Sequence, residues 1–131
     1  MNKKYLAKII AMDTEGLQMI SACCAGAEVK LADIKYLKKS KVFLLFFKRQ
    51  KIEVENEKKK INSICKFDFV DSVKSKNIKQ DNINQKLELI TMDYLKNNDN
   101  YEISLIFTNN AYITLSTEII EVTLDDQSKM D

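Results

Sequence analysis

Residues 13–31 read DTEGLQMISACCAGAEVKL, and within them the spacing of apolar residues changes from that of a helix to that of a strand. Asp13 is a typical helix N-cap, and Gly26 suits the left-handed residue that follows a helix. Apolar residues at helical spacing lie between them: Leu17, Ile20 and Cys24. We therefore predict a helix over residues 14–25, which Gly16 weakens by about 1 kcal/mol relative to alanine.

Outside the helix, apolar and polar residues alternate over short segments, which is typical of half-buried strands. The expected strands are 5–12, 28–37, 42–47, 61–76, 87–95, 101–107 and 111–115. Residues 42–47 read VFLLFF, so we expect this strand to be central and buried on both faces. A bulge or bend is expected near Asp33. Residues 117–124 fit either a further strand or a short closing helix.

The order of one strand, one helix and then about six strands separates the helix from the strands, which favours the α+β class. We predict one N-terminal helix packed on a mostly antiparallel, strongly curved sheet or half-open barrel of six to seven strands. Residues 1–131 form a single domain, since 45% apolar residues provide one core. Residues 48–60, KRQKIEVENEKKK, are expected to be a mobile charged loop, and residues 126–131 a frayed tail.

The composition argues against most familiar catalytic sites. The chain has no histidine, which removes Ser-His-Asp and Cys-His nucleophile systems and histidine metal ligands. It has no phosphate loop, dinucleotide fingerprint or CxxC spacing, so we predict no cofactor and no metal and lean against an enzyme. Asp33, Asp68 and Asp71 are candidates for acid–base chemistry, but nothing in the sequence brings them together. Tyr36, Tyr94, Tyr101 and Tyr112 are candidates to line a groove.

The cysteines and the longest apolar run indicate where the protein resides. An odd set of cysteines, Cys23, Cys24 and Cys65, does not resemble a secreted disulfide framework, and we expect these thiols to pack in the core. A redox or soft-metal role for Cys23 and Cys24 is the less favoured alternative. No signal peptide is visible, and residues 42–47 are too short to span a membrane. We predict a cytoplasmic protein.

Lysine-rich segments are the main candidate for a binding site. Cationic residues flank the expected loop and form a candidate anion-binding set: Lys48, Arg49, Lys51, Lys58, Lys59 and Lys60. The intervening acidic residues Glu53, Glu55 and Glu57 offset their field, and the net charge of the chain is only +2. An ordinary solvated surface is therefore the favoured interpretation, and an anion-binding rim is the alternative.

Several segments resemble a known family. They are residues 6–13 (LAKIIAMD), 20–22 (ISA), 29–37 (VKLADIKYL), and the later block of Phe67, Asp68, Val70, Ser72 and Val73. In this order they are similar to an uncharacterised bacterial family catalogued as domain of unknown function 2948. The resemblance implies no activity, and it transfers no functional residues to this chain.

Two functions remain open from the sequence. The first is a small non-enzymatic binding or protein-interaction module, with a partner protein or a second copy of the chain as its target. The second is an anion-recognising domain that uses the lysine-rich segments to bind nucleic acid or acidic lipid headgroups. Nucleic acid is less favoured, because Arg49 is the only arginine and lysine lacks the planar fork that grips phosphate or guanine.

Overall fold

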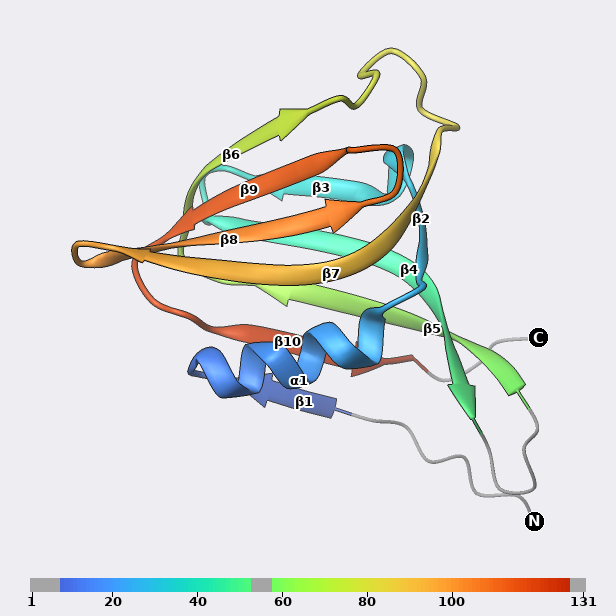
Figure 1. Ribbon diagram of the computed structural model, residues 1–131, viewed down its shortest axis with the longest axis horizontal. Helices are drawn as coiled ribbons and strands as arrows, with labels where there is room; N and C mark the ends of the chain where they lie inside the picture. Colours follow the sequence, from blue (N-terminus) through green and yellow to red (C-terminus); the bar gives the residue numbers. More distant parts are fainter. Residues whose placement is uncertain (1–7, 53–57, 128–131) are drawn as a thin grey trace.

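The computed structural model describes residues 8–52 and 58–127, apart from the side chains of residues 50–52, 58 and 59. In this part of the chain, one α-helix accompanies an antiparallel sheet (Figure 1). The helix is α1 (Thr14–Cys24), and a short 3₁₀ turn, η1 (Leu31–Asp33), follows later. The strands are β1 (Lys8–Ala11), β2 (Glu28–Lys30), β3 (Ile34–Leu37), β4 (Val42–Ile52), β5 (Lys58–Phe67), β6 (Val70–Lys76), β7 (Lys86–Asn97), β8 (Asn100–Phe107), β9 (Tyr112–Thr117) and β10 (Val122–Asp126).

The described strands form one ten-stranded sheet in the order β1-β10-β5-β4-β2-β7-β8-β9-β6, with β3 paired to β4 beside this path. Every pairing between them is antiparallel, which confirms the α+β class with an antiparallel sheet. The expected count of six to seven strands is wrong. One reason is that the predicted strand 61–76 is two strands, β5 and β6, separated at Phe69, whose φ is 60°. The expected strong curvature stays a prediction.

The N-terminal helix follows its sequence signals closely. The side chain of Asp13 accepts a hydrogen bond of 2.8 Å from the backbone N–H of Gly16, as an N-cap should. Gly26, with φ of 86°, occupies the left-handed region beyond the helix. A Cβ on Gly16 would lie 2.9 Å from the Cβ of Ala11, so a glycine here allows α1 to approach β1. The helix packs against β1 and β7.

Alternate residues of the central strands build the core. On β4 the side chains of Phe43, Leu45 and Phe47 are buried, and the ring of Phe43 meets the ring of Phe67 edge-on at 5.9 Å. The intervening residues of β4, such as Phe46, are only partly buried. The prediction that this strand is buried on both faces is therefore wrong for the second face, because that face borders an open groove.

Part of the segment expected as a mobile loop is strand. Strand β4 runs on to Ile52 and β5 begins at Lys58, with Lys51 paired to Lys59 in the backbone register. Pairing to a neighbouring strand overrides the polar composition of this hairpin. The expected loop residues 53–57 lie outside the described residues.

The chain after β9 is strand rather than helix. Residues 117–124 end β9 and enter β10, whose Val122 and Leu124 are buried. Asp126, expected in the frayed tail, is a buried residue of β10, while residues 128–131 lie outside the described residues. No helix in the described parts of the chain is long and apolar enough to cross a membrane.

Candidate functional site

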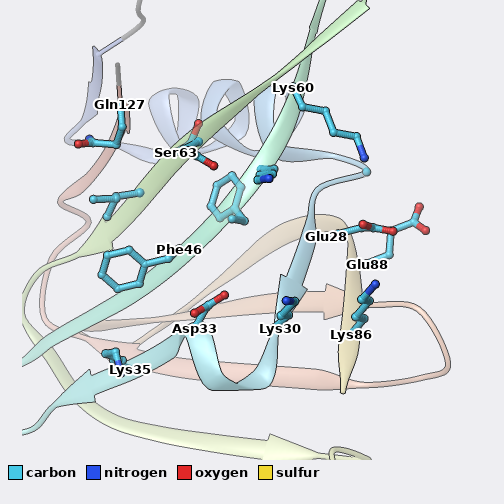
Figure 2. Close-up of a pocket in the computed structure, with 15 residues that line it drawn as sticks. Glu28, Lys30, Asp33, Lys35, Phe46, Lys60, Ser63, Lys86, Glu88 and Gln127 are labelled. Atoms are coloured by element: carbon cyan, nitrogen blue, oxygen red, sulfur yellow. The ribbon is translucent and has the colours of Figure 1, made fainter. Parts of the chain in front are cut away.

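A groove of about 810 Å³ opens on the face of β4 and β5 that is turned away from the core (Figure 2). It exists because β2 and β4 meet at only one residue pair, Glu28 with Lys48, whereas β2 pairs with β7 over three residues. The turn η1 then returns the chain so that β3, and not β2, pairs with the first half of β4. Side chains of β2 and of β4 therefore line the same groove.

Most of the groove is lined by polar side chains, and the part formed by β4 and β5 also has apolar surface. Phe46 of β4 and its cross-strand partner Ile64 of β5 supply this apolar contact area. Asn62 and Gln127 add amide groups next to it. Figure 2 shows Asp33 between Phe46 and Lys30, so a ligand there would meet an aromatic ring beside charged groups.

Charge dominates the rest of the lining. The charged residues of the groove are Lys30, Lys35, Lys48, Lys60, Lys86, Glu28, Asp33 and Glu88. The register of β2 with β7 places Glu28 opposite Glu88 and Lys30 opposite Lys86, so like charges face each other twice. Figure 2 shows the two glutamates side by side at one end of the groove. Among the described residues, no ion pair joins any of these eight side chains to another.

The predicted anion-binding residues separate in the structure. Lys48 and Lys60 line the groove, where Lys30, Lys35 and Lys86 join them. Arg49 lies on the opposite face of β4, in the core. The backbones of Lys51, Lys58 and Lys59 belong to the β4–β5 hairpin, and their side chains lie outside the described part of the structure.

Arg49 is held by a buried carboxylate. Its Nε and one terminal nitrogen donate to the two oxygens of Asp126 at 2.9 and 2.7 Å, and the Ser63 hydroxyl donates to the same carboxylate at 2.7 Å. Arg49 is 7% exposed and Asp126 4%. The hydrogen bonds that Arg49 donates to Asp126 raise the pKa of Arg49 further above its usual value. A bidentate, desolvated pair of this kind is structural, and it leaves Arg49 no role in the groove.

Comparison with known proteins places the chain in a family. Residues 7–131 match the family described as Protein of unknown function (DUF2948). The chain belongs to this family. The match spans nearly the whole chain, and it confirms the resemblance seen in the sequence. No curated protein and no solved structure matches the chain, so the function of this DUF2948 protein must be argued from its own site.

The remaining candidates of this DUF2948 protein do not gather in one site. Cys24 and Cys65 are buried in the core, as expected, and burial raises the pKa of the Cys65 thiol well above its usual value, with Cys24 adding to the shift. Asp71 pairs with Lys41 at 3.0 Å and Asp68 with Lys66 at 3.7 Å, on surfaces outside the groove. Asp33 alone of the three candidate aspartates lines the groove. The described residues contain no cluster of three metal-ligating side chains.

Sequence reasoning missed Lys30, Lys35 and Lys86, although their polarity in otherwise apolar strands was visible. Lys30 and Lys86 come from segments more than fifty residues apart in the sequence, and only the β2–β7 register brings them together. The strand alternation did carry one usable signal for Arg49. Side chains two residues apart on a strand point to the same face, so a strand that continues past Phe47 places Arg49 on the core face with Phe43 and Leu45.

Proposed function

We propose that this DUF2948 protein is a non-enzymatic binding module that holds a segment of a partner protein in the groove between β2 and β4. The observation that supports this most is the set of eight charged side chains that line one hollow without pairing to each other in the described structure. Its volume of about 810 Å³ falls within the range of about 300–1,000 Å³ that is usual for ligand pockets.

The chemistry of the lining supports recognition rather than catalysis. The groove offers ammonium groups, carboxylates, amides and the ring of Phe46. Glu28 and Glu88 are exposed to solvent, whereas acid–base catalysts are usually tuned by burial and specific partners. The buried thiols of Cys24 and Cys65 do not reach this surface.

Affinity capture tests the proposal. Immobilised protein would be incubated with lysate of the source cells, beside a Lys30→Glu/Lys86→Glu variant and a control Lys74→Glu/Lys76→Glu variant. The control changes the same charge on β6, where both lysines are exposed and outside the groove. We expect a specific protein that wild type and control retain and the groove variant loses. Capture that is the same for all three proteins, or no specific capture, would contradict the proposal.

Anion recognition is the second candidate, because five of the eight charged groove residues are lysines. Glu28, Asp33 and Glu88 oppose a long polyanion in the same groove, and Arg49 is occupied by Asp126. Titration with RNA, DNA and phosphatidylserine vesicles at low salt would support this function if affinity fell steeply as salt increased. Binding that does not change with Lys48→Glu/Lys60→Glu would rule out the groove as the anion site.

Two finer expectations belong to the proposal. The first is a strongly curved sheet or half-open barrel, which is supported by the hydrogen bond of 2.8 Å from the N–H of Val70, at the start of β6, to the carbonyl of Lys41, directly before β4. A crystal structure tests it. The second is a cytoplasmic location, supported by cysteines that are free in the described structure, and cell fractionation tests it.

A further inference from the structure

Two like-charged pairs face each other across β2 and β7, and Lys48 of β4 lies opposite Glu28 on its other side. In an antiparallel pair, residues directly opposite each other have Cβ atoms about 4.5–5.5 Å apart, and like charges at this separation repel. Glu28 faces Glu88, and Lys30 faces Lys86. The described structure provides none of these four side chains with an ion-pair partner. A ligand that neutralised both pairs would relieve both repulsions.

Each pair is suited to one group of opposite charge. Two ammonium groups side by side can both donate to one carboxylate, and two carboxylates can both accept from one ammonium or guanidinium group. Residues two apart on a strand lie about 6.7 Å apart on the same face. The basic pair and the acidic pair are offset by this distance, because Glu28 and Lys30 are two residues apart, as are Lys86 and Glu88.

An extended peptide has the same spacing. Its side chains at positions i and i+2 point to one face about 6.7 Å apart. We infer that the groove binds an extended segment of a protein that carries one acidic and one basic side chain two residues apart. The acidic side chain lies between Lys30 and Lys86, and the basic one lies between Glu28 and Glu88. This inference rests on the proposed function and adds the charge pattern of the partner.

Simpler ligands satisfy only half of the site. A metal cation between Glu28 and Glu88 leaves Lys30 and Lys86 unmatched, and a phosphate between the lysines is repelled by the glutamates two residues away. Nucleic acid repeats one sign of charge along its backbone and meets the same repulsion. A peptide can satisfy both pairs and also place an apolar side chain against Phe46 in the same groove.

Three short peptides of stated sequence test the spacing. All are acetylated and amidated, so that only side chains carry charge. The first is threonine-glutamate-valine-lysine-valine-threonine, the second has the same composition with glutamate and lysine adjacent, and the third replaces the lysine of the first by glutamate. Each would be titrated into ¹⁵N-labelled protein and followed by amide chemical shifts. The first should shift resonances of β2 and β7 and bind at least about tenfold more tightly than the second.

Charge-neutral variants identify the residues. Glu28→Gln/Glu88→Gln and Lys30→Gln/Lys86→Gln should each remove the preference for the first peptide, whereas Lys74→Gln/Lys76→Gln on β6 should keep it. Equal affinity for the first two peptides would overturn the inference. Tighter binding of the doubly acidic peptide would also overturn it, while leaving a binding groove in place. If none of the peptides caused shifts at about 1 mM, the inference would fail, and the proposed function would then be decided by the capture experiment alone.

Discussion

Lys48 and Arg49 are neighbours in the sequence, yet the two faces of β4 treat their charges in opposite ways. Arg49 is buried and donates two hydrogen bonds to the carboxylate of Asp126, which also accepts one from the hydroxyl of Ser63. Lys48 lies in the groove opposite Glu28 and makes no ion pair in the described structure. The core face accepts a charge only with a complete set of partners, whereas the groove face keeps several charges unpaired.

This difference separates a structural role from a binding role. Removing one member of a buried pair leaves an uncompensated charge in the core, so stability depends on Arg49 and Asp126. Exposed charges contribute little to stability and remain available to a ligand. Variants on the two faces should therefore differ in what they change, with the core face altering the free energy of unfolding and the groove face altering binding.

The largest effect is expected for Arg49→Ala. This substitution removes the guanidinium group that donates two hydrogen bonds to the buried carboxylate of Asp126, and we expect a loss of about 3–5 kcal/mol of unfolding free energy. Urea denaturation followed by circular dichroism measures it. Lys48→Ala is the matched control on the groove face and should change stability by no more than about 0.5 kcal/mol. Equal losses for the two variants would remove the contrast between the faces.

Replacing both Arg49 and Asp126 tests whether the ion pair itself stabilises the protein. A double variant, Arg49→Met with Asp126→Leu, removes both charges and keeps apolar volume in the core. We expect its unfolding free energy to lie close to that of wild type, because a buried ion pair often adds little over a well-packed apolar pair. A double variant as unstable as Arg49→Ala would show that the pair is needed for more than mutual neutralisation.

A smaller loss is expected for Ser63→Ala. Its hydroxyl donates to a buried carboxylate at 2.7 Å, and hydrogen bonds to charged groups contribute about 1.5–3 kcal/mol. Thermal and urea unfolding should both report a loss in this range. The adjacent Asn62→Ala, on the groove face, should remain within about 0.5 kcal/mol of wild type.

A substitution on the groove face should increase the free energy of unfolding instead of lowering it. Glu88→Lys places a cation opposite Glu28, so a repulsive cross-strand pair becomes an attractive one. We expect a gain of up to about 1 kcal/mol in unfolding free energy, together with weaker peptide binding. Glu88→Gln should give a smaller gain. Destabilisation by Glu88→Lys would mean that the free protein does not carry the repulsion inferred from the register.

The smallest effect concerns Lys41 and Asp71 at the surface. The hydrogen bond and the charge of Asp71 raise the pKa of Lys41 above its usual value of 10.5. A raised pKa in the folded state stabilises the protein fully below the usual pKa, and this contribution disappears as pH rises through the raised pKa. Wild type should therefore lose a small advantage over Asp71→Asn in strongly alkaline solution only. A difference between the two proteins that does not change with pH would contradict this origin.

Local chemistry explains why the helix could be predicted and the groove could not. The cap at Asp13, the apolar spacing and Gly26 are encoded within fourteen residues, and α1 forms where they indicate. Single strands were also visible through their alternation. Their number was not, because the turn at Phe69 and the 3₁₀ turn at residues 31–33 divide continuous patterns.

The groove depends on the pairing of distant segments. Nothing near Lys30 in the sequence specifies that Lys86 will lie opposite, and the separation of β2 from β4 is a property of the sheet as a whole. For residues 48–60, the polar composition suggested a loop. The pairing of β4 with β5 continues to Ile52 and Lys58 nonetheless, and this explains why Arg49 was assigned to the wrong surface.

The place of β10 in the sheet has a consequence for the order in which the protein folds. Residues 8–11 are synthesised before β10, yet in the described part of the chain β1 joins the sheet by pairing with β10, with Lys8 opposite Asp125 and Ala11 opposite Val122. The same strand carries Asp126 to Arg49. Residues 122–126 must therefore emerge from the ribosome before β1 can pair with β10 and before Arg49 can bind Asp126. Until then, the emerging chain exposes an unpaired strand edge at β5 and depends on rapid completion to avoid association with other chains.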